Sequence, residues 1–343
     1  MKKFTISFFI ALLVIGFSAN ATVHTVSNNQ NSPGQFTSLQ AAIDAASPGD
    51  TIYVSGSTSN YGSVTVSKQL TLIGAGYNPN NQFQFKTQLS TITLSMGTTT
   101  NPSGTLIMGF DLSGISCNSN NINNITITLN RIGTIGLGSR TINNWVIKNN
   151  ILNYVSSGSN STNILVFNNF ITQYLSGFNS TSVVVSNNIF LRNSPSSNIF
   201  ASVEYAVVTN NIVWGLSTGG CNYCTFNNNI SFGGNQTSFI YNNNTGQNNF
   251  ENVNPLFVNA PDFVFNYNHN YLLAAGSPGV GAGTDGTNIG IYGGAFPFPS
   301  GGPIPYQTSP VPPIPQVVSM NILNSVLPEN GTLQVEVEGK SQF

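Results

Sequence analysis

Apolar and polar positions repeat in one short phrase along the middle of the chain. In Trp145–Ile151 (WVIKNNI) the positions two and four residues before Asn149 are apolar, and so is the position two residues after it. Comparable phrases occur at Ile164–Phe170, Val183–Ile189, Ala206–Ile212 and Cys224–Ile230. Apolar residues at a period of two are typical of β-strands, and a phrase that recurs at a regular spacing is typical of solenoid proteins. The pattern therefore predicts an all-β solenoid built from short strands.

A column of asparagines follows from extending the register of these phrases. Its members are about 19 residues apart, with one step of 23, and are Asp111, Asn130, Asn149, Asn168, Asn187, Asn210, Asn228 and Asn248. Asparagine tolerates the left-handed conformation of a tight corner, and its amide can hydrogen-bond to an asparagine one coil above or below. We expect Asn130 and the asparagines after it to form a structural ladder. Apolar residues two positions later, such as Ile151 and Phe170, are expected to fill the core.

A repeat of this length holds the strands and turns of one coil of a parallel β-helix. It is too short for a propeller blade and lacks the leucine-rich consensus of a horseshoe repeat. Upstream, Ser38–Ala46 has the apolar spacing of a helix with Ser38 as its cap, and Pro48–Asp50 ends it before a strand at Thr51–Val54. We expect this helix to cover the first coil, because an open solenoid end is an unpaired strand edge.

Motifs at both ends of the repeats resemble the pectin-lyase-like superfamily of right-handed parallel β-helix proteins. They are the opening Ser38–Val54, the phrase Leu70–Gly76, and a close formed by Asn254–Val258, Gly276–Pro278 and Asn288–Gly294. The resemblance covers roughly residues 23–295. It implies a right-handed parallel β-helix of the bacterial secreted or surface type. It does not imply one activity, because the superfamily contains lyases, glycoside hydrolases, phage tailspikes and other surface proteins.

The N-terminus has the form of a secretory signal peptide. Met1–Lys3 is basic, Phe4–Phe17 is apolar, and Ala19–Ala21 has the small-x-small pattern of a cleavage site. We expect residues 1–21 to be removed and the mature protein to be secreted or held at the cell surface. No later stretch approaches the roughly 18 apolar residues of a spanning helix, so we expect no membrane span.

The remaining chain is expected to contain one folded domain and a tail. The β-helix is predicted over residues 22–295, and a Pro/Gly-rich linker follows over 296–315. In the last segment, 316–343, apolar Leu333 and Val335 alternate with polar residues, which predicts a short, half-buried β-strand.

Composition narrows the function. Charged residues make up only 6% of the chain, against about 25% in an average domain, and the formal net charge is -1. With no basic run after the leader, we expect no nucleic-acid partner.

Cys221 and Cys224 are spaced as CxxC but have no second Cys/His pair, so we expect no metal site. Together with Cys117, we expect them to be small buried side chains or to form one local bridge.

Hydrolysis by paired carboxylates is not expected. A glycosidase needs two carboxyl groups about 5 to 9.5 Å apart. Within the repeats the candidates are Asp111, Glu204 and Glu251. Asp111 and Glu204 are about five coils apart, roughly 24 Å at the spacing of stacked strands. Glu251 follows about two coils later in a different column.

The enzyme alternative is a polysaccharide lyase that acts on uronic-acid-containing polysaccharide by β-elimination. This reaction needs a cation at the sugar carboxylate and a base for the neighbouring proton. Arg131 and Lys148 flank the expected ladder on successive coils, with Asp111 one coil earlier and Arg140 between them. Superfamily lyases use Arg or Lys near acidic Ca²⁺ ligands, so Ca²⁺ is a cofactor only under this alternative. A lone carboxylate makes a poor Ca²⁺ site.

Binding without turnover is the function that we expect. A surface rich in Asn, Ser and Thr, with some aromatic side chains, suits a polysaccharide or cell-surface glycan through hydrogen bonds and ring stacking. Tyr154, Tyr174 and Phe178 follow the ladder on neighbouring coils and are the candidate stacking residues. The sequence thus predicts a monomeric, non-catalytic extracellular protein that contacts glycans, or one with a purely structural or adhesive role.

Overall fold

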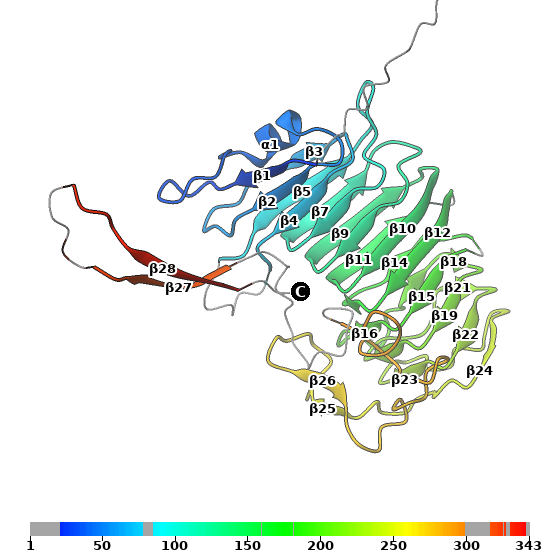
Figure 1. Ribbon diagram of the computed structural model, residues 1–343. Helices are drawn as coiled ribbons and strands as arrows, with labels where there is room; N and C mark the ends of the chain where they lie inside the picture. Colours follow the sequence, from blue (N-terminus) through cyan, green and yellow to red (C-terminus); the bar gives the residue numbers. More distant parts are fainter. Residues whose placement is uncertain are drawn as a thin grey trace, which may run out of the picture.

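The computed structural model describes residues 21–77, 85–158, 160–180, 182–298, 316–324, 326 and 330–340. The predicted signal peptide, apart from its last residue, and most of the predicted linker lie outside these ranges. Within them, two eleven-stranded sheets run along one axis as a parallel β-helix (Figure 1). The predicted all-β solenoid is therefore confirmed.

Successive coils contribute a strand to each sheet. In the first sheet the strands stack in the order β1 (Val23–Val26), β2 (Thr51–Val54), β4 (Thr71–Gly74), β6 (Leu106–Met108), β8 (Thr126–Thr128), β10 (Ile142–Lys148), β12 (Ser161–Phe167), β15 (Val184–Ser186), β19 (Val207–Thr209), β22 (Thr225–Asn227) and β24 (Thr245–Gln247). In the second sheet the main order is β3 (Val64–Val66), β5 (Gln88–Leu94), β7 (Asp111–Cys117), β9 (Arg131–Gly138), β11 (Ile151–Ser157), β13 (Phe170–Ile171), β16 (Ile189–Leu191), β20 (Ile212–Trp214) and β23 (Ile230–Phe232).

Shorter strands complete the coils. In the second sheet β14 (Leu175–Ser176) pairs with β11 and β17 (Phe200–Ala201). β18 (Val203–Glu204) and β21 (Cys221–Asn222) form a separate two-stranded parallel sheet. The antiparallel pair β25 (Phe257–Asn259) and β26 (Asn270–Leu273) follows the last coils.

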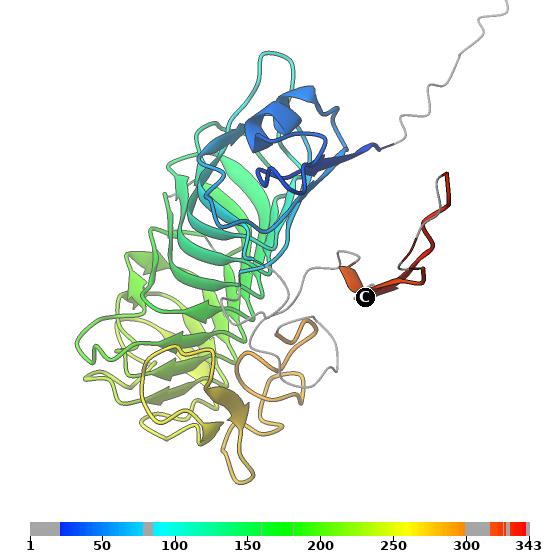
Figure 2. The ribbon, with the colours of Figure 1, turned by 90° about the vertical axis from the view of Figure 1, so that its left-hand side faces the viewer.

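The predicted capping helix is present as α1 (Leu39–Ala45), at the N-terminal end of the solenoid (Figure 2). The Ser38 hydroxyl accepts a hydrogen bond from the Ala41 amide, which is the expected N-cap contact. At the other end, the Lys68 ammonium donates to the Ala46 carbonyl at 2.7 Å. The helix buries Leu39, Ala42 and Ile43. Across the described ranges, no helix is long and apolar enough to cross a membrane.

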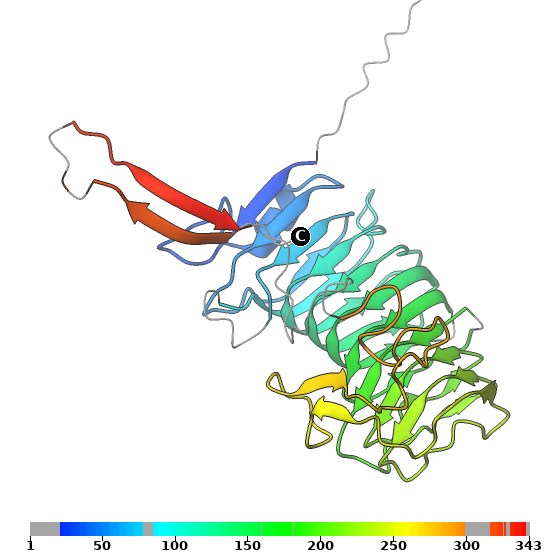
Figure 3. The same ribbon diagram turned by 60° about the horizontal axis from the view of Figure 1, so that its bottom comes forward.

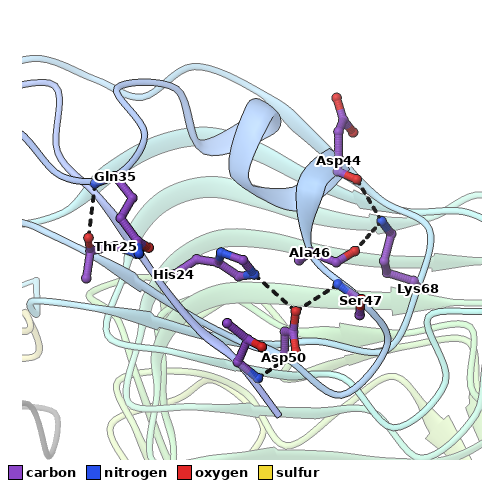
Figure 4. Close-up of polar contacts among 9 residues, drawn as sticks. His24, Thr25, Gln35, Asp44, Ala46, Ser47, Asp50 and Lys68 are labelled. Carbon is purple, nitrogen blue, oxygen red and sulfur yellow. Dashed lines mark hydrogen bonds and ion pairs between the residues drawn. The ribbon is translucent and has the colours of Figure 1, made fainter. Parts of the chain in front are cut away.

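A buried carboxylate joins the first strand to the turn after α1 (Figure 4). Asp50 is 3% exposed and accepts hydrogen bonds from the backbone amides of Thr22, at 2.7 Å, and Ser47, at 2.8 Å. His24 Nε2 lies 3.0 Å from the same carboxylate. Burial tends to raise the pKa of Asp50, but the amide hydrogen bonds and His24 outweigh it, and the pKa is lowered.

The hydrogen-bonded asparagine column is the inner one of two. Asn150 Nδ2 donates to Asn169 Oδ1 at 3.0 Å, and Asn169 Nδ2 donates to Asn188 Oδ1 at the same distance. The full column is Asn130, Asn150, Asn169, Asn188, Asn211, Asn229 and Asn249. Only Asn130 belongs to the column expected from the sequence. The register differs because two successive steps are 20 residues long. Asp111 pairs with Arg131, so Asp111 lies in a strand and not in the ladder. Arg131 pairs with Ile151, which aligns Asn130 with Asn150 and not with Asn149.

The remaining asparagines of the expected column form an outer column at the same corner. Asn149, Asn168, Asn187, Asn210, Asn228 and Asn248 have left-handed φ angles of 53 to 59°. Asn168 Nδ2 donates to the carbonyls of Ile291, at 2.8 Å, and Gly293, at 2.9 Å. The side-chain amide of Asn149 donates to the Phe296 carbonyl, and that of Asn228 donates to the Ala282 carbonyl. We call residues 282–296 the C-terminal strap, because the outer column holds it along the solenoid.

Two hydrophobic clusters follow from this arrangement. Leu152, Ile171 and Phe190 point into the solenoid and join its main core. Their neighbours Ile151 and Phe170 face the opposite side, since successive strand residues alternate, and pack in a second cluster. This cluster includes Tyr271, Ile289, Ile291 and Phe298 from the C-terminal part of the chain. The expectation that Ile151 and Phe170 fill the solenoid core is therefore wrong, although both are buried.

The tail forms an antiparallel hairpin of β27 (Gln316–Ile322) and β28 (Val335–Lys340), which pair only with one another among the described residues (Figure 3). Val335 is 40% exposed, Val337 53% and Met320 67%. The predicted β segment is present, but the described apolar side chains are exposed where half-burial was expected.

Candidate functional site

A groove of about 620 Å³ crosses the second sheet over β5, β7, β9, β11 and β16. Residues 263–265, which come from the chain after the last coil, form its opposite wall. Among the described residues four charged side chains line the groove, namely Lys86, Asp111, Arg131 and Arg192. Three cations against one carboxylate give the groove a positive charge in a protein whose formal net charge is -1.

The strand register brings three of these charges together. Gln88 pairs with Asp111, and Asp111 pairs with Arg131, on successive coils. Lys86 Nζ lies 2.6 Å from Asp111 Oδ2, and an Arg131 guanidinium nitrogen lies 3.8 Å from the same oxygen. The second contact is longer than a hydrogen bond, and the Arg131 side chain is 51% exposed. Arg131 can therefore present its donors to a ligand.

Lys86 and Arg192 are the charged groove residues that the sequence analysis missed. Lys86 lies 25 residues before Asp111 and outside the regular phrases. Lys86 stands two residues before Gln88, which pairs with Asp111 on the next coil. The repeated phrases do not include Gln88, so they gave no signal for this pairing.

Amide side chains continue the groove beyond its charged end. Asn153 in β11, Gln173 after β13 and Asn193 after β16 line it on successive coils. Amides both donate and accept hydrogen bonds, so this part of the groove can bind a row of hydroxyl groups.

Two of the three predicted stacking residues are brought together beside the groove. Tyr154 and Tyr174 stack with ring centroids 5.2 Å apart and planes at 22°, and each directly follows a groove residue, Asn153 or Gln173. The third, Phe178, is 1% exposed in the solenoid core and offers no surface to a ligand. Its assignment as a ligand-binding residue is wrong, because the chain turns this side chain inward after β14.

The four residues of the predicted lyase site do not all converge. Asp111 and Arg131 share the groove, as described above. Lys148 lies on β10 in the first sheet, where its ammonium sits 3.9 Å from the ring centroid of Phe296, and burial lowers its pKa. Arg140 follows the end of β9. Burial raises the pKa of the Cys117 thiol, and the charge of Arg140 opposes this shift. Neither Lys148 nor Arg140 lines the groove, because the corner between the sheets separates Lys148 from Arg131.

A partly buried tyrosine, Tyr267, adds a further group near the charged end of the groove. The hydroxyl of Tyr267 has no hydrogen-bond partner within the described part of the chain. Burial raises the pKa of Tyr267 to about 12, with Arg131 opposing this shift and Asp111 adding to it. The hydroxyl is therefore protonated at neutral pH. It can donate a hydrogen bond but is a weak base.

Glu251 and the three cysteines, which were also candidates, occupy structural positions. Glu251 accepts hydrogen bonds from the Ser238 hydroxyl, at 3.0 Å, and the Phe239 amide, at 2.8 Å. The three cysteines are buried free thiols. In the ranges that the structure describes, no three His, Cys, Asp or Glu side chains are grouped so that they could hold a metal ion.

No protein-family model matches this chain, and a search of curated proteins finds no significant match. The chemistry of the groove is therefore the basis on which a function can be proposed.

Proposed function

We propose that this chain is a secreted or cell-surface protein of the pectin-lyase-like type that binds an acidic polysaccharide without cleaving it. The observation that carries the proposal is the groove in which Lys86, Arg131 and Arg192 outnumber Asp111. Guanidinium groups bind carboxylates and sulfates through paired, charge-assisted hydrogen bonds. An acidic sugar bound beside Arg131 therefore supplies the negative charge that the groove lacks.

The length and polarity of the groove support a polymeric ligand. Asn153, Gln173 and Asn193 extend it across several coils, where they can bind the hydroxyl groups of consecutive sugar units. The stacked rings of Tyr154 and Tyr174 lie next to these amides and suit the apolar face of a pyranose. A small anion would use only the charged end.

A polysaccharide lyase is the second candidate, favoured by one observation. Arg131 lies beside Asp111, and the charges of both residues influence the pKa of the Tyr267 hydroxyl. A cation, Arg131, and a proton donor, Tyr267, therefore occur near one another. Elimination also needs a base for the proton next to the carboxylate. Lys148 is on the other sheet and Tyr267 is protonated at neutral pH, which is why we favour binding over cleavage.

Affinity electrophoresis tests the binding proposal. Gels containing pectate, alginate or chondroitin sulfate should retard the wild-type protein relative to gels without polysaccharide. The double variant Arg131→Ala/Arg192→Ala should bind at least about tenfold more weakly, because it loses two charge-assisted contacts. Arg140→Ala is the matched control, since it also removes an arginine charge but lies outside the groove. Equal retardation of all three proteins, or retardation of none, would contradict the proposal.

The same polysaccharides distinguish binding from cleavage. A lyase creates an unsaturated uronate that absorbs near 235 nm. We expect a flat trace from the wild-type protein with and without added Ca²⁺. A rise in absorbance that Arg131→Ala abolishes would make the protein a lyase.

Secretion is tested separately. Expression of the full chain in a bacterial host should yield an exported protein whose N-terminus is Thr22. An exported or cell-associated product that still carries residues 1–21 would contradict a cleaved signal peptide.

A further inference from the structure

A second corner column contains two tyrosines where asparagines stand on other coils. It lies at or just before the start of the strands of the first sheet, and the register of those strands aligns its members, with Ser182 on one coil in place of an asparagine. The left-handed residues Asn124, Asn144, Asn163, Tyr205, Tyr223 and Asn243 belong to it, with φ between 51 and 63°. Asparagine adopts this conformation readily, whereas a bulky side chain is strained in it. Tyr205 and Tyr223 are thus in positions that the backbone does not favour for them.

Both tyrosines present their rings to solvent. Tyr205 is 41% exposed and Tyr223 50% exposed. Their ring centroids are 5.4 Å apart and their planes differ by 11°. Stacked carbon atoms touch at about 3.5 to 4 Å, so the rings are displaced sideways as in offset stacking. The pair therefore presents two partly exposed aromatic rings on successive coils.

A polar pocket of about 370 Å³ adjoins this pair of rings. Glu204, Asn222, Asn242 and Asn243 line it, and Glu204 directly precedes Tyr205. Asn243 Nδ2 donates to Asn222 Oδ1 at 3.2 Å, which fixes the two amides relative to one another. Of the residues that the structure places around this pocket, Glu204 is the charged one. A carboxylate accepts strong hydrogen bonds from hydroxyl groups and repels anions.

We propose that Tyr205, Tyr223 and the adjoining pocket form a second glycan site, and that its ligand is a neutral pyranose. The apolar face of the sugar ring stacks on the tyrosines, and its hydroxyl groups bond to Glu204 and the asparagine amides. Glu204 disfavours an acidic sugar here. This site shares no lining residue with the groove on the second sheet, so it extends the proposed function to a second class of ligand.

The double variant Tyr205→Asn/Tyr223→Asn tests this site, because asparagine suits the corner but has no ring. Affinity gels containing hydroxyethyl cellulose, galactomannan or laminarin serve as the neutral probes. At least one should retard the wild-type protein, and the variant should bind it at least about tenfold more weakly. The variant should also have an unchanged or higher Tm, because the strain at both corners is relieved. Tyr205→Phe/Tyr223→Phe keeps both rings and should still be retarded.

Two further variants separate this site from the groove. Arg131→Ala/Arg192→Ala should keep its retardation by the neutral polysaccharide, even where its binding to acidic ones is lost. The Tyr205→Asn/Tyr223→Asn variant should keep its binding to acidic ones. The inference is overturned if no neutral polysaccharide retards the wild-type protein, or if the asparagine variant is retarded equally. A lower Tm together with lost retardation would assign the pair a packing role and would also overturn it.

Discussion

The side-chain amide of Asn150 donates to the side-chain oxygen of Asn169 at 3.0 Å, and this contact recurs from coil to coil along the buried corner of the solenoid. Asn169 Oδ1 also accepts the backbone amide of Asn150 at 2.9 Å. The inner asparagines thus satisfy both side-chain and backbone groups that are out of reach of water.

Replacing one inner asparagine should destabilise the protein. Asn169→Ala leaves the backbone amide of Asn150 without its acceptor, while the Asn150 side-chain amide still donates to the Ile127 and Lys148 carbonyls. A buried unsatisfied group costs about 1 to 3 kcal/mol. We expect thermal unfolding to shift down by at least about 2 °C. Asn168→Ala is the control from the outer column, and its Tm should fall less. Equal losses in the two variants would contradict the separate roles of the columns.

The outer asparagine column should stabilise the C-terminal strap against local opening but should not stabilise the solenoid. Asn168→Ala/Asn187→Ala removes side-chain hydrogen bonds to the carbonyls of Gly290, Ile291 and Gly293. Hydrogen exchange measured by mass spectrometry should become faster in peptides from residues 282–296, because local opening costs less free energy. Exchange in β10 to β15 should be unchanged. Faster exchange in both regions would mean that the outer column stabilises the whole solenoid.

These columns mark the limit of the sequence prediction. The repeated phrase predicted parallel coils and an asparagine-rich corner, because both depend on spacing alone. It could not tell which member of the pair Asn168–Asn169 faces inward, because both are asparagines at the corner between β12 and β13. The 20-residue step from Arg131 to Ile151, which aligns Asn130 with Asn150, decides the register, and only the strand pairing reveals it.

The groove was predictable only in part for a similar reason. Asp111 and Arg131 are neighbours by coil spacing, so their contact follows from the repeat. Lys86 lies outside the phrases, and the wall at residues 263–265 comes from chain that follows the last coil. A repeat pattern does not predict contacts of that kind, because they depend on tertiary packing.

Stability at acidic pH should depend on Asp50. Its pKa is lowered in the folded state, so the ionised carboxylate stabilises the fold above its unfolded pKa of about 3.9, and this contribution is lost as the pH falls through the folded pKa. Tm measured from neutral pH down to about pH 2 should drop steeply below about pH 4 in the wild-type protein. Asp50→Asn should start lower at neutral pH and show a shallower drop.

The control for this pH experiment is Asp44→Asn, which neutralises an exposed carboxylate at the same end of the molecule. Its pH profile should follow that of the wild-type protein. If Asp50→Asn has the same profile as well, Asp50 does not account for the acid sensitivity.

Binding at the two proposed glycan sites should depend differently on the salt concentration. Exposed charges are screened over about 8 Å at physiological ionic strength and over about 3 Å at 1 M. Binding of an acidic polysaccharide next to Arg131 and Arg192 should therefore weaken steadily as NaCl is raised, in affinity gels run at several salt concentrations. Retardation by a neutral polysaccharide through Tyr205 and Tyr223 should change little. A neutral site with the same salt dependence would indicate that both ligands bind in the cationic groove.

Calorimetric titration of one acidic oligosaccharide tests the central claim most directly. The ligand is a hexasaccharide cut from the acidic polysaccharide that retards the wild-type protein most. A saturating heat is predicted for the wild-type protein and for Arg140→Ala, with an affinity lower by at least about tenfold for Arg131→Ala/Arg192→Ala. The same affinity in all three proteins, or no heat from the wild-type protein, would contradict binding in the groove.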